Sequence, residues 1–283
     1  MAIIIDGKLT ATKYNNALKD SINEMVQKGN RQPKLVVIQI GSNEASSLYI
    51  RNKKRACENV GILFEHKVFE ESVSESNLLD EINKLNNDES VDGFLVQLPL
   101  PKNIDEDKII NAISPSKDAD GFCPITLGNV VLNKSKIFPG TPKGIIRLLD
   151  EYKIDVTGKK VVVVGRSNIV GKPISIMLTN LSATVTVCHS KTVDLKSETC
   201  KADILIVAIG SAKFIKEDFV KDGAIIIDVG TNKVDGKFCG DVDFESVKEK
   251  VSAITPVPGG VGPMTVNSLL ENVFTLYKEK VGN

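Results

Sequence analysis

The segment of residues 160–173, KVVVVGRSNIVGKP, constrains the fold more than any other part of the chain. Its four consecutive valines are typical of a strand that is buried on both faces of a parallel sheet. Gly165 ends this run, and Gly171 and Pro173 then open a helical pattern, with the proline close to the helix start. The segment therefore predicts a strand, a glycine turn and a helix N-terminus, which is a local structure that binds phosphate groups.

The residues after the next predicted strand, 183–188, indicate which dinucleotide would bind. NAD-binding units carry an acidic residue about 20 positions after the glycine turn, whereas a basic residue there accommodates the 2′-phosphate of NADP. The strand is followed by His189, Ser190 and Lys191, with no acid, and Arg166 directly follows the first glycine. We interpret Arg166 and Ser190 as 2′-phosphate ligands and Lys191 as a solvated charge. Ordinary turn and surface roles are the alternative, because the glycine spacing departs from G-x-G-x-x-G.

The length and charge of the chain limit its architecture and partners. At 283 residues it exceeds the usual size of a single core, so two domains are expected, and alternating strands and helices predict an α/β fold with mostly parallel sheets. Basic and acidic residues balance at 36 each, so no excess charge attracts nucleic acid or an anionic membrane. No apolar segment approaches a membrane span, and the N-terminus lacks the basic region of a signal peptide. We expect a cytoplasmic protein without nucleic-acid or membrane partners.

Cysteine and histidine usage gives no sign of a metal site. The five cysteines are scattered, odd in number and free of C-x-x-C pairs, which indicates neither a disulfide framework nor a zinc site. With only two histidines as well, we expect no metal.

Three groups of polar residues in the first 120 positions are candidates for chemistry. Tyr49 and Lys53 are four residues apart in a predicted helix and share a face, where a ring could meet a flat ligand and an amine could exchange protons. A core-edge aromatic and a surface lysine are the structural alternative. Gln97 ends an apolar strand, and a buried amide needs a partner. Asp118 and Asp120 precede a glycine, where a carboxylate suits a ligand with adjacent N–H donors but is also common in turns.

Two apolar runs and a glycine-rich segment in the second half point to a ligand. The runs 203–210 and 224–230 each end on a glycine, and Thr231 follows the second. Because ligands of such sheets bind at the carboxyl ends of strands, these glycines either approach the cofactor or form simple turns. Residues 254–263, ITPVPGGVGP, predict a loop that offers backbone to a ligand. Residues 265–281 predict a last helix that packs back on the first domain.

Seven short segments occur in order along nearly the whole chain. They are YIRNK (49–53), VQLPLP (96–101), KDADGF (117–122), PGTPKG (139–144), GRSNIVGKP (165–173), HSKT (189–192) and PVPGGVGPMT (256–265). Together they resemble the motifs of the bifunctional 5,10-methylenetetrahydrofolate dehydrogenase/5,10-methenyltetrahydrofolate cyclohydrolase family. Gly140 departs from the family, which commonly has cysteine there, but no chemical step depends on that position.

The resemblance implies a two-domain enzyme with an active-site cleft between its domains. Residues 1–120 with the C-terminal helix 265–283 would form a folate-binding catalytic domain, and residues 139–264 a Rossmann-like NADP-binding domain. The implied activity is oxidation of 5,10-methylenetetrahydrofolate with NADP, followed by hydrolysis of the methenyl product to 10-formyltetrahydrofolate. The resemblance also implies a homodimer and a role in one-carbon metabolism and purine biosynthesis.

The same resemblance implies roles for individual residues. Lys53 would be the catalytic residue, Gln97 the amide beside it, and Tyr49 a catalytic-site ring that stacks on the folate. Asp120 would bind the pterin. The residues implied in cofactor binding are Gly165, Arg166, Ser167, Gly171, Ser190 and Thr231. The backbone of Pro258, Gly259 and Gly260 would line the substrate.

Two other functions fit parts of the sequence. An NADP-dependent dehydrogenase of another small substrate could share the two-domain plan, and only the motifs of the first domain separate it from the folate enzyme. A non-catalytic NADP-binding module is the second alternative, against which the combination of Lys53, Gln97 and Asp120 argues. Some family members use NAD, so the choice of dinucleotide rests on Arg166 and Ser190. Formate ligation is not expected, because the chain lacks a G-x-x-x-x-G-K-[ST] phosphate loop.

Overall fold

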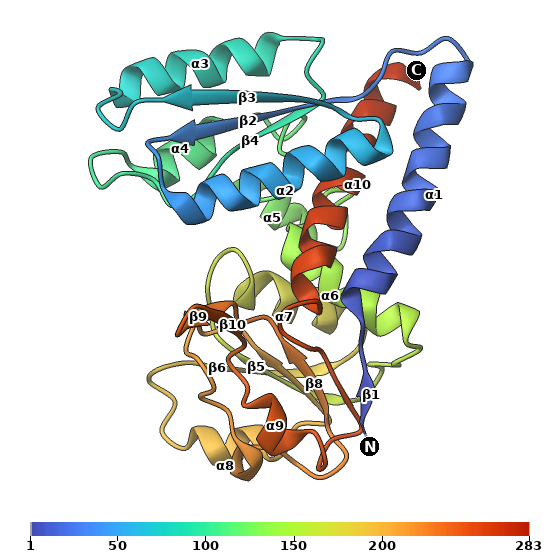
Figure 1. Cartoon of the computed structure of the whole chain (residues 1–283), viewed down its shortest axis with the longest axis vertical. Coiled ribbons are helices and arrows are strands. Elements are labelled where there is room, and N and C mark those ends of the chain that lie inside the picture. The colour runs from blue at the N-terminus through green and yellow to red at the C-terminus, as the bar shows by residue number, and fades with distance from the viewer. Residues whose placement is uncertain (1, 283) are drawn as a thin grey trace. The chain divides into compact units, whose positions relative to one another are not determined.

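The computed structural model describes residues 2–282, which divide into two compact α/β units (Figure 1). The first, called here the six-stranded unit, comprises Met1–Thr12 and Thr141–Thr265, and the second, the three-stranded unit, comprises Lys13–Gly140 and Val266–Asn283. The division differs from the sequence-based boundaries at the N-terminus. There, β1 (Ile3–Ile4) pairs with β11 (Ala253–Ile254) and so belongs to the six-stranded unit.

The six-stranded unit is built on one parallel sheet with the strand order β1-β11-β8-β7-β5-β6. Its four longer strands are β5 (Lys160–Val164), β6 (Thr184–Cys188), β7 (Ile204–Val207) and β8 (Ile225–Asp228), and β6 lies at the edge of the sheet. The valines of β5 are buried, as their pattern predicts. After β6 the chain returns to the opposite side of β5 to form β7. Such a reversal leaves a crevice at the carboxyl ends of the strands, where ligands of open α/β sheets bind.

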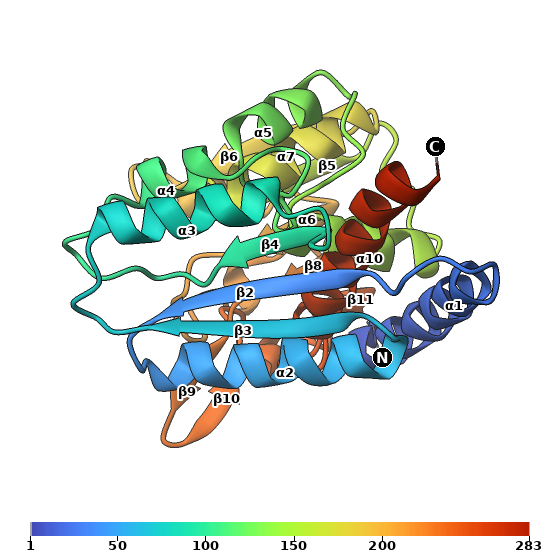
Figure 2. The same cartoon turned by 90° about the horizontal axis from the view of Figure 1, so that it is seen from above.

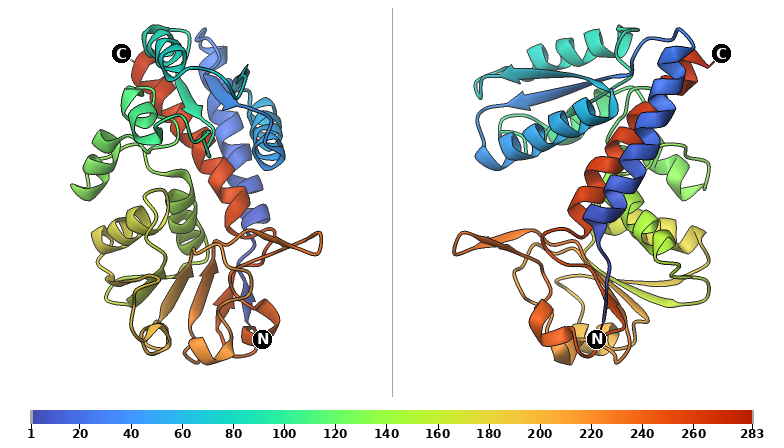
Figure 3. Two further views of the ribbon diagram at one scale, coloured as in Figure 1. Left: turned by 90° about the vertical axis from the view of Figure 1, so that its left-hand side faces the viewer. Right: turned by 45° about the vertical axis from the view of Figure 1, so that its right-hand side comes forward.

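Short helices and a hairpin complete this unit. The helices are α6 (Gly140–Glu151), α7 (Gly171–Asn180), α8 (Leu195–Thr199), the 3₁₀ helix η1 (Glu217–Phe219) and α9 (Phe244–Val247). The antiparallel hairpin of β9 (Asn232–Val234) and β10 (Lys237–Cys239) extends away from the sheet of its unit (Figure 3). Its strands are three residues long, which is too short for a recognisable alternating pattern, so sequence reasoning missed it.

The three-stranded unit has a parallel sheet in the order β3-β2-β4, with helices on both faces (Figure 2). Its elements are β2 (Lys34–Ile40), α2 (Glu44–Val60), β3 (Leu63–Phe69), α3 (Glu75–Asn87), β4 (Gly93–Val96), α4 (Glu106–Ala112) and α5 (Pro124–Val131). Alternate side chains of β2 enter two different cores. Leu35 packs with α1 (Gly7–Gln27), α2 and α10 (Val261–Val281), whereas Val36 packs with α3 and α4.

Local sequence signals explain where several of these elements begin and end. Asn43 caps α2 by accepting a hydrogen bond from the Ser46 amide at 3.0 Å, and Gly61 ends the helix with a φ of 89°. Three elements differ from the sequence-based expectations. The apolar run 91–101 predicts a longer strand than β4, and residues 114–142, which show no regular pattern, contain α5. Helix α10 begins at Val261, inside the predicted loop.

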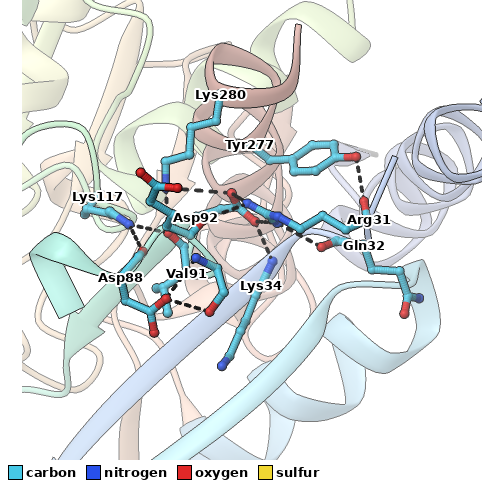
Figure 4. A network of polar contacts seen from close by, with 11 residues as sticks. Arg31, Gln32, Lys34, Asp88, Val91, Asp92, Lys117, Tyr277 and Lys280 are labelled. Carbon is cyan, nitrogen blue, oxygen red and sulfur yellow. Dashed lines mark hydrogen bonds and ion pairs between the residues drawn. The ribbon is translucent and has the colours of Figure 1, made fainter. Parts of the chain in front are cut away.

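A buried carboxylate ties together segments of the three-stranded unit (Figure 4). Asp92 is fully buried and accepts two hydrogen bonds of 2.7 Å from Arg31, one through each carboxylate oxygen. It also accepts a 2.8 Å bond from the Lys34 amide, and the ammonium of Lys280 lies 3.8 Å away. Tyr277 of α10 donates to the carbonyl oxygen of Arg31 at 2.7 Å. The network therefore fixes the start of β2 and the end of α10 to the segment before β4.

Candidate active site and dinucleotide-binding site

Lys53 and Gln97 are in direct contact in the three-stranded unit. The Lys53 ammonium donates a 2.9 Å hydrogen bond to Gln97 Oε1. The Gln97 amide nitrogen donates to the carbonyl oxygen of Leu98 at 2.9 Å, which turns the amide oxygen toward the lysine. Both side chains are only partly exposed. Gln97 directly follows β4, so the carboxyl end of this strand presents a neutral acceptor to an amine on α2.

The two neighbouring aspartates have different surroundings, which the sequence alone did not separate. The buried carboxylate of Asp118 accepts hydrogen bonds from the amides of Gly121, Phe122 and Cys123 at 2.9–3.2 Å. Its role is to hold this turn. Asp120 accepts no hydrogen bond from any described residue and keeps part of its surface exposed. Burial within the surrounding protein raises its pKa, and the positive charge of Lys53 opposes that rise.

The backbone around Asp120 is fixed from α10. Asn272 is fully buried and donates a 3.0 Å hydrogen bond to the carbonyl oxygen of Ala119. Asp118 and Asp120 also line a small pocket whose other walls are apolar, among them Phe94 and Phe122. Asp120 is thus an acceptor that is available to a ligand and is held in place by its neighbours.

Tyr49 lies one helical turn before Lys53 on α2 and exposes 47% of its surface. An exposed ring beside an ammonium is suited to a flat ligand rather than to the core. One turn after Lys53, Cys57 is buried, and burial raises the pKa of its thiol to about 12. Cys57 is therefore a thiol at neutral pH and not a competing nucleophile.

In the six-stranded unit, the two glycines of the β5–α7 turn are needed for close packing. A Cβ on Gly165, whose φ is 123°, would lie 2.2 Å from the carbonyl oxygen of Ala208, and one on Gly171 would lie 2.2 Å from the carbonyl oxygen of Gly165. The Ser167 hydroxyl accepts from the amides of Val170 and Gly171 at 3.2 and 3.3 Å. Ser167 thus satisfies amides at the start of α7, where the strand order of the sheet reverses.

Three predicted cofactor residues present exposed side chains on this unit: Arg166 in the turn after β5, Ser190 after β6 and Thr231 after β8. The loop after β6 is shaped by its own contacts, because the amide of His189 donates to the Thr192 hydroxyl at 2.9 Å. Since β5 and β6 are adjacent, Arg166 and Ser190 follow neighbouring strands at the same edge of the sheet.

The proline-glycine segment before α10 packs against the N-terminal residues of the same unit. The amide of Lys8 donates a 3.0 Å hydrogen bond to the carbonyl oxygen of Gly259, whose φ is 107°. A Cβ on Gly7 would lie 1.8 Å from the carbonyl oxygen of Gly260, so side chains are excluded there. Pro258 is exposed, and the peptide bond before it is cis.

Sequence reasoning missed two buried carboxylates at the carboxyl end of the six-stranded sheet, Asp228 and Asp241. Asp228 ends the apolar strand β8, just as Gln97 follows β4. The same argument, that a buried polar group in an apolar strand needs partners, could have identified Asp228. Asp241 follows the unpredicted hairpin and carried no comparable signal.

Burial raises the pKa of Asp228 to about 6, from an ordinary value of 3.8, and predicts how stability depends on pH. Between these two values the folded state holds a proton that the unfolded state has lost, so stability falls as pH rises through this window. We expect a change of about 3 kcal/mol at most, because one pKa unit corresponds to about 1.4 kcal/mol. Denaturant unfolding of the wild type and Asp228→Asn checks this. Their difference in unfolding free energy should change between pH 4 and 6 and be constant above pH 7. A difference in unfolding free energy that does not change with pH would contradict the raised pKa of Asp228.

Among residues 2–282, no helix combines the length and apolar character needed to cross a bilayer. Over the same described range, no cluster of three or more His, Cys, Asp or Glu side chains is arranged to hold a metal ion.

The parallel sheets and the glycine turn at the strand reversal define a two-unit α/β protein of the dinucleotide-binding type, which confirms the predicted fold class. Two family models match the chain: the tetrahydrofolate dehydrogenase/cyclohydrolase catalytic domain at residues 5–120 and the NAD(P)-binding domain of the same proteins at residues 139–281. The chain therefore belongs to the tetrahydrofolate dehydrogenase/cyclohydrolase family.

Individual relatives support this assignment over the full length. The bifunctional protein FolD of Sulfurihydrogenibium sp. (strain YO3AOP1) is 54% identical and covers 99% of both chains. The crystal structure of the bifunctional FolD enzyme of Campylobacter jejuni is 46% identical, with a TM-score of 0.97, and covers 99% of this chain and 100% of that one. The Trypanosoma brucei enzyme, solved with NADP cofactor and an inhibitor, is 35% identical with a TM-score of 0.95, and covers 100% and 99%.

Proposed function

We propose that this protein oxidises 5,10-methylenetetrahydrofolate to 5,10-methenyltetrahydrofolate with NADP and hydrolyses that product to 10-formyltetrahydrofolate. The observation that carries the proposal is the 2.9 Å contact of the Lys53 ammonium with Gln97, beside the unpartnered carboxylate of Asp120. These residues lie in the part of the chain that matches the family's catalytic domain. The match of residues 139–281 to an NAD(P)-binding domain supports the nucleotide requirement.

The oxidation step depends mainly on positioning. The methylene carbon lies between two nitrogens whose lone pairs stabilise a cation, so a hydride can leave that carbon with its electron pair. NADP, when bound, accepts this hydride, and no protein base has to remove a proton. The glycine turn of Gly165 and Gly171 would bind the pyrophosphate, with Ser167, Arg166, Ser190 and Thr231 as further cofactor contacts. The exposed ring of Tyr49 would stack on the folate and set its orientation.

The hydrolysis step requires proton transfers. Water adds to the methenyl carbon and loses a proton; a C–N bond then breaks, and the released nitrogen takes up a proton. Lys53 is the group that we assign to these transfers. Gln97 orients the lysine through a neutral amide, whereas a carboxylate in that position would hold the ammonium's proton more tightly. Asp120 would accept hydrogen bonds from the adjacent N–H groups of the pterin, and the backbone of Pro258, Gly259 and Gly260 would line the substrate.

Arg166 is proposed to select NADP over NAD. Removal of a charge-assisted contact to the 2′-phosphate costs about 1.5–3 kcal/mol, so Arg166→Ala should raise the KM for NADP about 10- to 100-fold and leave the KM for NAD unchanged. Steady-state kinetics with both dinucleotides measure this effect. Lys191→Ala is the matched control, because Lys191 is interpreted as a solvated charge and should show no such discrimination. If NAD is the preferred cofactor of the wild type, the assignment of Arg166 and Ser190 is wrong.

We further propose that the protein is a cytoplasmic homodimer acting in one-carbon metabolism for purine biosynthesis. The five cysteines are free thiols, which is consistent with a reducing compartment. Light scattering coupled to size-exclusion chromatography should give twice the mass of the 30.7 kDa chain. A monomeric mass at assay concentrations would contradict the homodimer.

The proposed reaction is tested by turnover of methylenetetrahydrofolate with NADP. NADPH and 10-formyltetrahydrofolate should form in equal amounts. Formation of NADPH without 10-formyltetrahydrofolate would contradict the proposed cyclohydrolase activity. Binding of NADP without turnover of any folate would favour the non-catalytic module.

A further inference from the structure

Two buried carboxylates in the six-stranded unit take no direct part in the chemistry described above. Asp228 and Asp241 are 3% and 0% exposed, and their hydrogen-bond partners are amides rather than cations. A buried carboxylate without a cationic partner is costly unless N–H donors saturate it. For both carboxylates, backbone segments at the carboxyl end of the sheet supply these donors.

The side chain of Asp241 connects the loop after β7 to Asn232, the residue that follows Thr231. One carboxylate oxygen accepts from the amides of Ile209 and Gly210 at 2.7 and 3.0 Å. The other accepts from the amide of Ser211 at 2.8 Å and from the side-chain amide of Asn232 at 2.9 Å. One side chain thus holds three consecutive amides of one loop and the start of the β9–β10 hairpin.

Asp228 holds the other side of Thr231. One of its oxygens accepts from the amides of Gly230 and Asp241, both at 3.0 Å, and the other accepts from the amide of Val242 at 2.9 Å. The packing leaves no room for side chains nearby. A Cβ on Gly230 would lie 2.3 Å from the Asp241 carboxylate carbon. Thr231 therefore lies between one residue held by Asp228 and another held by Asp241.

The loop held by Asp241 also contacts the glycine turn. The amide of Ala208 donates to the carbonyl oxygen of Val164 at 2.8 Å, and Gly165 packs against the Ala208 carbonyl so closely that a Cβ would lie 2.2 Å from its oxygen. A continuous series of contacts thus runs from the glycine turn, through residues 208–211 and Asp241, to Thr231.

The strand order indicates which half of a dinucleotide this series would meet. The glycine turn follows β5, and β6, which carries Ser190, lies on one side of it. If the 2′-phosphate of the adenosine half is on the β6 side, the pyrophosphate spans β5, and the nicotinamide half extends over β7 and β8.

We propose that Asp241, supported by Asp228, is a positioning residue for hydride transfer, because it sets the backbone that contacts the nicotinamide half of the cofactor. The proposal rests on the NADP-dependent oxidation proposed above. A carboxyl group suits this role because its two oxygens have room for all four N–H donors. An asparagine at position 241 would turn an N–H₂ group toward N–H donors and release part of the loop.

The test is Asp241→Asn, assayed for both activities at a temperature where the variant is folded. A displacement of about 1 Å at the reacting centre can reduce a rate about 100-fold. We expect the dehydrogenase kcat to fall about 10- to 100-fold and the KM for NADP to change less than about 3-fold. The kinetic isotope effect with a deuterated methylene bridge should increase. Cyclohydrolase activity on methenyltetrahydrofolate without NADP should be unchanged, whereas a merely structural role would lower both activities.

Two further variants keep the test decisive. Asp235→Asn, at the exposed tip of the same hairpin, is the matched control and should alter neither activity. Asn232→Ala removes a single donor to Asp241 and should give a smaller loss of dehydrogenase kcat in the same direction. If Asp241→Asn does not fold, Asn232→Ala replaces it in the test.

Three outcomes would overturn the inference. One is an unchanged kcat in the tested variant, and another is a parallel loss of both activities. The third is a wild type that oxidises no methylenetetrahydrofolate, which would contradict the proposed function as well. Failure of the inference alone is distinguished from this by an active wild type.

Discussion

Replacement of Lys53 by methionine should lower cyclohydrolase activity by about 10³-fold or more. General acid–base catalysis contributes about 10²- to 10⁴-fold, and Lys53 is the group assigned to all the proton transfers of hydrolysis. Methionine keeps the length of the side chain but removes the donor to Gln97. Dehydrogenase activity should also fall sharply, because the amine helps to orient the substrate, although it transfers no proton in the hydride step.

The adjacent residue offers a control for this variant. Lys54 is also on α2, but its side chain is 58% exposed and lies within 3.9 Å of Glu58. Lys54→Met makes the same chemical change outside the proposed site and should retain both activities. Direct hydrolysis of methenyltetrahydrofolate, measured from its loss of absorbance, compares the three proteins. A near-normal cyclohydrolase rate in Lys53→Met would show that Lys53 does not transfer the protons of hydrolysis.

The largest expected effect on stability is at Asp92. Asp92→Ala removes the carboxylate that accepts both Arg31 bonds and the Lys34 amide, and it leaves Arg31 and Lys280 without their counterion (Figure 4). Loss of one partner of a buried ion pair costs about 3–5 kcal/mol, and the partial exposure of Arg31 places the expected loss near 3 kcal/mol.

Chemical denaturation of the wild type and Asp92→Ala measures this loss as a change in unfolding free energy. Glu89→Ala, an exposed acidic position three residues earlier, should change stability by less than about 0.5 kcal/mol. A loss below about 1 kcal/mol for Asp92→Ala would mean that the network in Figure 4 contributes little.

The strongest periodic patterns predicted most of the fold. The valine run of β5 and the apolar run at residues 34–40 correspond to buried strands, and Asn43, one of two predicted caps with Ser42, caps α2. These signals are local, so they can be read from sequence. The pairing of β1 with β11 could not be, because it joins residues about 250 positions apart through two-residue strands.

In the candidate site, too, local patterns could be read from the sequence and long-range contacts could not. The helical spacing of Tyr49 and Lys53 and the isolated amide of Gln97 identified residues that the structure describes as an exposed ring and a bonded pair. The choice between Asp118 and Asp120 required coordinates, since only the structure assigns three backbone donors to Asp118. Asp241 could not be identified because three of its four donors are backbone amides, which have no sequence signature.

Lys53 is proposed to transfer the protons by which the oxidised folate is hydrolysed. The decisive measurement of this role follows NADPH and methenyltetrahydrofolate together during turnover of methylenetetrahydrofolate, with an enzyme-free control for spontaneous hydrolysis. We predict that the wild type forms NADPH with little methenyl product, whereas the residual turnover of Lys53→Met releases the two in equal amounts. Formation of 10-formyltetrahydrofolate by Lys53→Met at the wild-type ratio to NADPH would contradict the claim.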